Sequence, residues 1–219
     1  MSWLSFVILT APAAMAAGAL YSTAAVLVIY NAFRTGQAWR FGLANTVTLF
    51  RLSLTCVLAG AGMQATIWSP ALGLASALIA ALALGLDGVD GWAARRFGTQ
   101  SRFGARFDME VDAGFVAALS MLVWWVTPAG AWVLAIGAMR YAFVAAGWFC
   151  PWLRADLPGS LRRQTICVIQ GIALTIALLP PASGLAAPVT AAALVLLALS
   201  FGVDTIWLYR NRRSGGAGR

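Results

Sequence analysis

Residues 87–112 read DGVDGWAARRFGTQSRFGARFDMEVD, a polar stretch in a chain that is otherwise strongly apolar. The whole chain has only seven acidic residues, and this stretch holds five of them: Asp87, Asp90, Asp108, Glu110 and Asp112. Ionised carboxylates among membrane-spanning segments are costly, so a cluster of them marks a functional site with a cationic partner. Asp87 and Asp90 are three residues apart and Asp108 and Asp112 four apart, so on helices each pair shares a face. Two such faces turned toward each other would offer oxygen ligands to a hard divalent cation.

The composition around this stretch is typical of an integral membrane protein. The chain has 219 residues, 61% of them hydrophobic, and a mean hydropathy of +0.82. We expect an all-α fold, a polytopic transmembrane helical bundle with six core spans and one extra N-terminal span. The apolar stretches that define these spans lie at 3–33, 52–68, 71–92, 109–127, 130–149, 165–180 and 187–209.

The positive charges predict how the bundle is oriented. All fifteen basic residues are arginines, and they gather in alternate loops and in the tail, whereas the intervening turns carry no charge. This pattern places the arginine-rich loops and the aspartate cluster on the cytoplasmic side of the membrane. We expect a multi-pass protein of a bacterial-type inner membrane. Arginines dispersed at loop ends suit anionic membrane lipids and phosphates, and they do not form a nucleic-acid surface.

Histidine and cysteine chemistry is not expected in this chain. It has no histidine, which excludes a histidine base or ligand, and its three cysteines, Cys56, Cys150 and Cys167, show no zinc or disulfide spacing. We divide the chain into an extra N-terminal transmembrane segment at 1–34, one domain at 35–213 and a flexible tail at 214–219. The N-terminal segment lacks the basic start of a signal peptide, so we expect a retained span.

The polar stretch matches the pattern D-x2-D-G-x2-A-R-x8-G-x3-D-x3-D at eight positions: Asp87, Asp90, Gly91, Ala94, Arg95, Gly104, Asp108 and Asp112. In this it resembles the CDP-alcohol phosphatidyltransferases, and the resemblance extends over residues 43–213. The resemblance implies transfer of a phosphatidyl or similar phospho-alcohol group from a CDP-linked donor, CDP-diacylglycerol first among them. The group passes to the hydroxyl of an acceptor alcohol, and CMP is released.

The resemblance also implies a role for each aspartate. Asp87, Asp90 and Asp108 are expected as metal ligands, and Asp112 as a ligand that is also the catalytic general base. All-carboxylate sites suit Mg²⁺ or Mn²⁺, and two ions could clamp the attacking and leaving oxygens. Since a carboxylate with a reference pKa of about 3.9 is a weak base, the acceptor hydroxyl must be positioned and acidified close by.

Donor contacts are expected on both sides of the metal ligands. Gly91 and Gly104 would leave space for a nucleotide against the backbone, although glycine is also common wherever membrane helices pack closely. By resemblance Arg95 contacts the donor diphosphate or cytidine, and Ser101 touches the donor. Arg95 could instead be a membrane-interface anchor, and Ser101 a solvated loop residue.

An upstream element, residues 44–51 (ANTVTLFR), resembles the family's P-N-x2-T-x2-R, with Ala44 in the place of proline. Asn45 and Thr48 share a helical face and are expected to reach the nucleotide; helix capping is the alternative. We expect Thr35–Phe50 to form an interfacial helix that leads into the first core span.

The acceptor side is predicted from two arginines. Arg140 lies in the middle of an expected span and would either approach the acceptor phosphate or pair with an aspartate. Relatives that make phosphatidylglycerol phosphate carry a G-K-x-K-T element before the fifth core span, where residues 159–165 of this chain read GSLRRQT without a lysine. Arg163 could substitute for one of those lysines as a phosphate binder. Tyr141 stands where these relatives carry glutamate. Glycerol 3-phosphate, inositol phosphate, serine and other lipids therefore all remain open as acceptors. We expect Asp204 to pair with the tail arginines.

Three other functions are compatible with parts of the pattern. A UbiA-type prenyltransferase also uses aspartate pairs and Mg²⁺, but with different spacing and without D-G-x2-A-R. A cation-coupled transporter would use the carboxylates for its coupling ion, although the chain shows no internal repeat. A catalytically silent partner protein would not need four intact aspartates. A homodimer is an assembly known among relatives, and no interface is legible in the sequence.

Overall fold

The computed structural model describes residues 11–34, 43–63, 68–97, 102–155 and 157–212, and these residues form helices without a strand. The all-α prediction is confirmed. Seven α-helices and three short 3₁₀ turns follow one another: α1 (Ala11–Arg34), α2 (Leu43–Gly62), α3 (Pro70–Phe97), α4 (Arg102–Val126), η4 (Ala131–Val133), α5 (Leu134–Phe149), η5 (Pro151–Arg154), α6 (Leu161–Ala177), η6 (Pro180–Leu185) and α7 (Ala186–Asn211).

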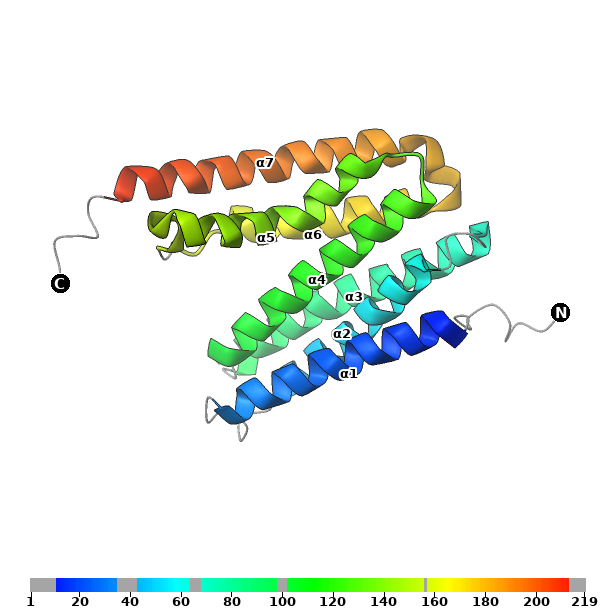
Figure 1. The fold of residues 1–219 in the computed structure, drawn as a ribbon, viewed down its shortest axis with the longest axis horizontal. Coiled ribbons are helices and arrows are strands. Elements are labelled where there is room, and N and C mark those ends of the chain that lie inside the picture. The colour runs from blue at the N-terminus through cyan, green and yellow to red at the C-terminus, as the bar shows by residue number, and fades with distance from the viewer. Residues whose placement is uncertain (1–10, 35–42, 64–67, 98–101, 156, 213–219) are drawn as a thin grey trace.

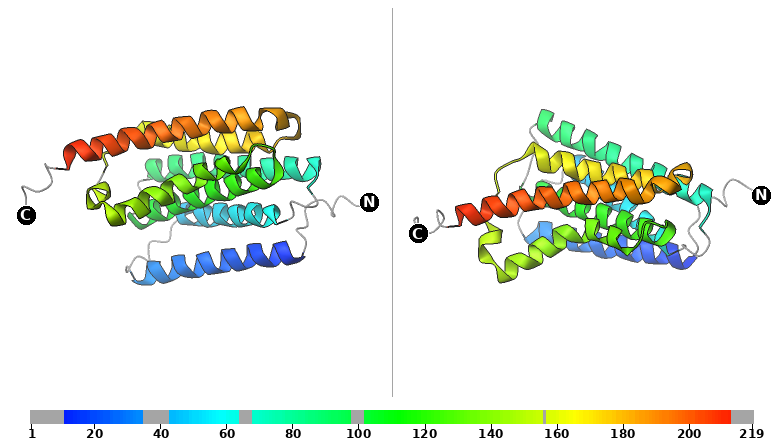
Figure 2. Two further views of the ribbon diagram at one scale, coloured as in Figure 1. Left: turned by 45° about the horizontal axis from the view of Figure 1, so that its top comes forward. Right: turned by 90° about the horizontal axis from the view of Figure 1, so that it is seen from above.

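Successive helices run in opposite directions, so that the chain passes up and down through the bundle (Figure 1). Helix α4 is central, because it packs against α2 on one side and against α5 and α6 on the other. Helix α1 packs on α2 at one edge of the bundle, and α6 and α7 pair at the opposite edge (Figure 2). The helix ends next to the arginine-rich loops therefore lie together at one end of the bundle. The C-terminus lies at the same end (Figure 1).

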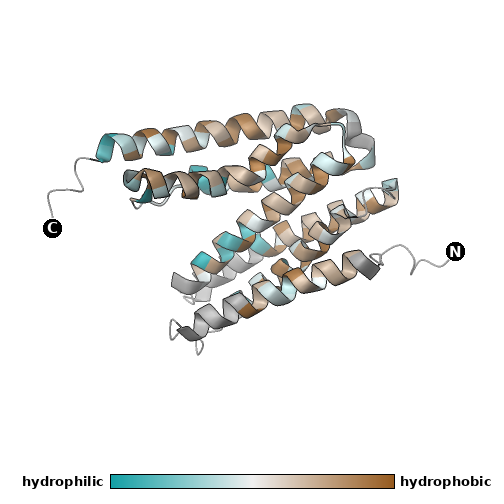
Figure 3. Cartoon of the chain, in the orientation of Figure 1, coloured by the Kyte–Doolittle hydropathy of each residue, from teal (hydrophilic) through white to brown (hydrophobic). Residues whose placement is uncertain are grey.

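The interior and the outer surface of the bundle are both apolar. Leu58 of α2, Leu119 and Leu122 of α4 and Leu174 of α6 are fully buried in one apolar core. Large apolar side chains also cover the outside, and hydrophobic colouring extends along most of the helices (Figure 3). In water such a surface would be a liability, whereas lipid chains solvate it at no cost.

Four helical segments of the described chain are long and apolar enough to cross a membrane: Pro70–Gly88, Gly104–Val126, Ala131–Phe149 and Ala186–Asn211. The chain is therefore a multi-pass membrane protein. Helix α2 carries the charge of Arg51 in its middle, and α6 has only 17 residues. The prediction of six core spans and one extra span stays a prediction in its exact number.

The prediction of a separate interfacial helix over Thr35–Phe50 is wrong for residues 43–50. Helix α2 begins at Leu43 and continues to Gly62, so Asn45 and Thr48 lie in the first two turns of the core helix itself. Residues 35–42 lie outside the described chain. Alanine at position 44 favours the helix, and no glycine or proline interrupts it before Gly60.

Helices α4 and α5 approach each other closely at Gly137. A methyl group on this glycine would lie 2.6 Å from Cα of Ala117, a backbone atom that cannot move aside alone. Small residues at such crossings let two membrane helices touch along their backbones. The contact holds α5, and with it Arg140 one turn further on, against α4.

We expect Gly137→Ala to destabilise the protein by about 1–3 kcal/mol, because the added methyl forces the two helices apart. Gly202→Ala in α7 is the matched control: a methyl group there meets nothing within 4 Å. It should be neutral or slightly stabilising, since alanine is the better helix former. Apparent melting temperatures in detergent compare the two. Equal temperatures for both variants would contradict a tight α4–α5 contact.

Candidate active site

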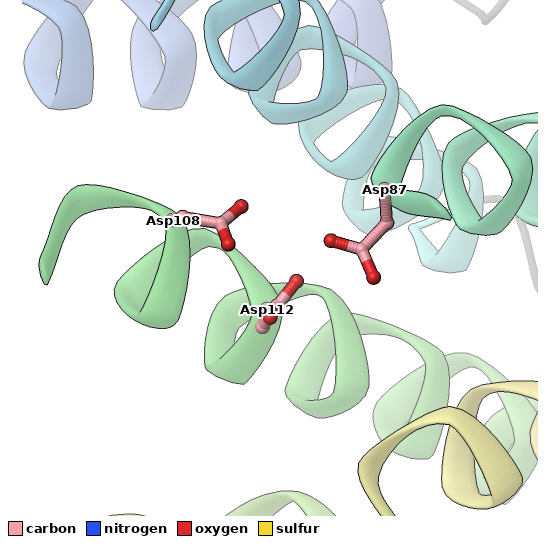
Figure 4. Close-up of side chains that lie close together, drawn as sticks. All are labelled: Asp87, Asp108 and Asp112. Carbon is pink, nitrogen blue, oxygen red and sulfur yellow. The ribbon is translucent and has the colours of Figure 1, made fainter. Parts of the chain in front are cut away.

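Three of the predicted metal ligands converge in the structure. Asp87 comes from α3, and Asp108 and Asp112 come from successive turns of α4. One carboxylate oxygen of each lies within 4.8 Å of the others (Figure 4). The expectation that the two aspartate-bearing faces meet is thus confirmed for these three residues. Asp90 lies one turn beyond Asp87 in α3, and its side chain is outside the described part of the structure.

The cluster is assembled by α2, which packs against both α3 and α4. Arg51 extends from the middle of α2 between the two carboxylate-bearing helices. Its Nη1 forms an ion pair with Oδ1 of Asp87 at 2.8 Å and donates to Oδ1 of Asp108 at 2.7 Å. Its Nη2 donates to Oδ1 of Asp112 at 2.5 Å, and its Nε donates to the carbonyl of Ala83 at 3.2 Å. One guanidinium therefore ties three helices together.

Arg51 is the residue at this site to which the sequence analysis assigned no role. Its side chain is 3% exposed, whereas Asp87, Asp108 and Asp112 are 28%, 39% and 27% exposed. The guanidinium is thus enclosed, and the carboxylates face partly outward. The sequence did contain a signal for this role. Arg51 is the last residue of the element at 44–51, and a lone arginine in an apolar helix needs a buried anionic partner.

The carboxylates that meet at Arg51 fit a divalent metal. They are hard oxygen donors from two helices, close enough to share one ion, which is the donor set that Mg²⁺ and Mn²⁺ prefer. Arg51 stands beside the same oxygens as a fixed positive charge. It holds the carboxylates together and offsets their mutual repulsion.

The predicted donor contacts are only partly visible. Asn45 and Thr48 are buried in α2, on the helix that carries Arg51. Gly104 lies in the first turn of α4, one turn before Asp108. The side chain of Arg95 and the surroundings of Gly91 are outside the described structure, although both positions belong to α3, and Ser101 lies outside the described residues altogether. The donor-binding roles stay predictions.

The two predicted acceptor arginines meet in one cavity. It has a volume of about 540 Å³, lies among α4, α5, α6 and α7, and is lined by Asp112, Arg140 and Arg163 together with mainly apolar side chains. Arg140 donates to Glu110 at 2.5 Å, so the acid that pairs with it is not one of the clustered aspartates. Asp112 belongs to both the carboxylate cluster and the cavity wall, and it thereby joins the two sites.

Asp204 pairs with arginines of α6 and not with Arg210 or Arg212, the tail arginines that the structure describes, contrary to our expectation. Its carboxylate contacts Arg162 at 2.5 Å and Arg163 at 3.5 Å, and Arg162 also donates to the hydroxyl and carbonyl of Ser200. The reason is the antiparallel packing of α6 and α7, which sets Asp204 beside the start of α6. Arg210 is six residues, about 9 Å, further along the helix.

We expect Arg51→Met to lower the stability of the metal-free protein by roughly 2–4 kcal/mol, because it leaves three carboxylates without their shared cation. The partial exposure of Asp108 keeps the effect below that of a fully buried network. Adding Mg²⁺ should restore part of the loss, since it supplies the missing positive charge. Apparent melting temperatures with EDTA and with Mg²⁺ measure both effects.

Arg106→Met is the control for this change, because it removes the same charge from an exposed position of α4. It should leave the melting temperature almost unchanged. An Arg51 variant as stable as the Arg106 variant in EDTA would contradict the organising role of Arg51.

The chain is similar to several curated bacterial enzymes. CDP-diacylglycerol--glycerol-3-phosphate 3-phosphatidyltransferases from Salmonella choleraesuis (strain SC-B67), Escherichia coli (strain K12) and Shigella boydii serotype 4 (strain Sb227) are each 35% identical to it over 111 residues. The match covers 46% of this chain and 59% of each relative. The chain thus spans somewhat more than half the length of the relatives it matches, and no solved structure matches it.

A broader comparison covers most of the domain. The sequence model of the CDP-alcohol phosphatidyltransferases matches residues 41–203, a range that starts just before α2 and ends within α7. It includes the three clustered aspartates, Arg51 and the whole cavity lining apart from Asp204. The spacing of the aspartates and their convergence in space agree with this match, and the chain belongs to the CDP-alcohol phosphatidyltransferase family.

Proposed function

We propose that this protein transfers a phosphatidyl group from CDP-diacylglycerol to a phosphorylated alcohol, with glycerol 3-phosphate as the acceptor, and releases CMP. The position of Asp112 carries the proposal. Its carboxylate belongs to the cluster suited to metal and also lines the cavity that holds Arg140 and Arg163. An acceptor in the cavity would therefore meet the donor at Asp112. The names of the similar enzymes supply the donor and the acceptor.

The metal site of this proposal consists of Asp87, Asp90, Asp108 and Asp112, holding Mg²⁺ or Mn²⁺, with two ions as the resemblance implies. Bound metal would neutralise negative charge on the donor diphosphate. The chain's own contribution is to keep the carboxylates assembled through Arg51. Asn45, Thr48, Gly91, Arg95, Ser101 and Gly104 are proposed to hold the CDP part of the donor.

Asp112 would accept the proton of the acceptor hydroxyl. The hydroxyl oxygen then forms a bond to the phosphorus that carries diacylglycerol, and the bond from this phosphorus to the CMP oxygen breaks. CMP leaves with the electron pair of that bond. Because Asp112 is tied to Arg51 at 2.5 Å, its carboxylate is held in one direction and needs no reorientation to receive the proton.

Arg140 and Arg163 are proposed to bind the acceptor phosphate, which is the chemistry that a pair of guanidinium groups suits best. Each has an anionic neighbour that holds it in place: Glu110 for Arg140, and Asp204 for Arg163. Arg163 is also bonded to the carbonyl of Pro158. Inositol phosphate would use the same pair, so it is the second acceptor to test.

The placement in the membrane follows from the same site. We propose an inner membrane location with the arginine-rich end in the cytoplasm, where soluble acceptor and CMP can enter and leave. The acyl chains of the donor would stay in the bilayer. Residues 1–34 are proposed as an additional membrane segment outside the catalytic domain; α1 packs on α2 and does not line the cavity.

The direct test is CMP release by purified protein with CDP-diacylglycerol, Mg²⁺ and glycerol 3-phosphate, with inositol phosphate, serine and no acceptor in parallel. We expect release that depends on acceptor and metal. Asp112→Asn should lower kcat by about 100-fold or more, since it removes the proton acceptor. Absence of both CMP release and metal-dependent CDP binding would contradict the proposal and favour a cation-coupled transporter.

The role of Arg140 gives a separate prediction. Arg140→Met should raise KM for glycerol 3-phosphate roughly 10- to 100-fold, because a charge-assisted hydrogen bond to the phosphate is lost. KM for CDP-diacylglycerol should change little. Arg106→Met, which removes an exposed arginine, is the control for net charge. An unchanged KM for the acceptor in the Arg140 variant would exclude this residue from acceptor binding.

A further inference from the structure

Gln170 is a polar residue in the apolar inner part of the cavity. It belongs to α6, lines the cavity and is only 1% exposed. Its Nε2 donates to the carbonyl of Ala193 on α7 at 2.9 Å. Its Oε1 is buried and has no hydrogen-bond partner among the described residues, and it is the only such side-chain atom there. Buried polar atoms without a partner are rare in folded proteins and call for an explanation.

The orientation of the carboxamide follows from Ala193. Turning the amide over would bring Oε1 against the carbonyl oxygen of Ala193, and two acceptors cannot bond to each other. Nε2 must therefore face Ala193, and Oε1 must be the atom that lacks a partner. A carbonyl oxygen only accepts hydrogen bonds, so the missing partner is a donor.

Gln170 lies deeper in the bundle than Asp112, the residue at which the acceptor is proposed to react. Arg163, Cys167 and Gln170 follow one another on the cavity-lining face of α6, and Gln170 lies about 10 Å beyond Arg163 along the helix. The neighbouring Gly171 packs near Phe115: a methyl group on the glycine would lie 3.4 Å from that ring. Phe115 is three residues beyond Asp112, so Gln170 lies about one helical turn deeper than Asp112.

On the other helices of the cavity wall, the lining residues furthest from the arginine-rich end are apolar: Val116 on α4, Ile136 on α5 and Leu197 on α7. Nearer the arginine-rich end, Ser200 is engaged with Arg162, and Asp204 with Arg162 and Arg163. A ligand hydroxyl that reaches the inner part of the cavity therefore finds one acceptor, Oε1 of Gln170.

We propose that Gln170 determines acceptor specificity by accepting a hydrogen bond from a non-reacting hydroxyl of the acceptor. The inference rests on the proposed function: the phosphate lies between Arg140 and Arg163, the reacting hydroxyl lies at Asp112, and a second hydroxyl reaches one turn deeper. The terminal torsion of glutamine is soft, so the carboxamide can turn slightly toward this hydroxyl. The acceptor class is a phosphorylated polyol rather than a phosphorylated alcohol with one hydroxyl.

A substrate pair that differs in one hydroxyl tests this directly. 3-Hydroxypropyl phosphate is glycerol 3-phosphate without the secondary hydroxyl, so it leaves Oε1 without a donor. Sites built around a substrate hydroxyl reject analogues that lack it. In acceptor-dependent CMP release the wild-type protein should prefer glycerol 3-phosphate at least tenfold in kcat/KM. Gln170→Met, which has nearly the same volume, should reduce this preference to about twofold or less.

Thr175→Val is the matched control. It also replaces a buried polar group of α6 by an apolar one, but Thr175 bonds only to the carbonyl of Gly171 and is not part of the cavity lining. It should keep the full preference. Gln170→Asn, which retains a shorter carboxamide, should keep an intermediate preference and serves as the second variant if Gln170→Met does not fold.

Stability provides a readout that distinguishes specificity from a structural role. Gln170→Met removes an unsatisfied buried acceptor, and the carbonyl of Ala193 retains its place in the helical bonding of α7. The melting temperature of the variant should thus be equal to that of the wild type or higher, although discrimination is lost. A structural role for Gln170 would lower the melting temperature and leave the preference intact.

The remaining outcomes separate the two proposals. Equal use of both phosphates by the wild-type protein, or the same preference in Gln170→Met, would overturn the inference and leave Oε1 to a buried water molecule. If no acceptor supports CMP release, the proposed function fails, and calorimetric binding of the same two phosphates decides the inference. Tighter binding of glycerol 3-phosphate that is lost in Gln170→Met would support it, and equal binding would overturn it.

Discussion

The structure depends on the contact of one buried guanidinium with three carboxylates. Asp87, Asp108 and Asp112 repel one another, and in an apolar bundle each would be costly without a counter-charge. Arg51 supplies that charge from α2 and forms an ion pair with each of the three. Since α2 packs against both α3 and α4, this contact links the two aspartate-bearing helices through a third helix. The candidate metal site is therefore a consequence of how α2 is placed.

The same requirement for counter-charge shapes the acceptor side. Every carboxylate side chain that the structure describes contacts an arginine: the three clustered aspartates contact Arg51, Glu110 contacts Arg140, and Asp204 contacts Arg162 and Arg163. At the cavity, Glu110 and Asp204 together face three arginines, so one positive charge remains to attract a phosphate. Where three acids share one arginine, negative charge remains to attract a divalent metal. The two sites thus differ in the ratio of their charges, and Asp112 lies at the border between them.

Some of this arrangement could be predicted from local patterns. The four-residue spacing of Asp108 and Asp112 specifies a common helix face, and the apolar stretches predicted the helices of the bundle. The role of Arg51 was missed, although its position in an apolar helix implied an anionic partner. The partners of Asp204 and the continuous start of α2 were also predicted incorrectly. The arginines that pair with Asp204 depend on which helix ends lie at the same depth in the bundle. The start of α2 depends on whether the helix continues through Ala44.

The class of fold, the family and the chemistry of the carboxylates can be read from local sequence, because helix period and motif spacing are properties of a single segment. The packing of the helices in three dimensions is what brings Arg140 and Arg163 to Asp112 in one cavity, sets Arg51 among the aspartates and leaves Gln170 with an unsatisfied oxygen. Each of these depends on the rotation and depth of one helix relative to another. Those quantities result from many weak packing contacts, such as Gly137 against Ala117, that no local pattern records.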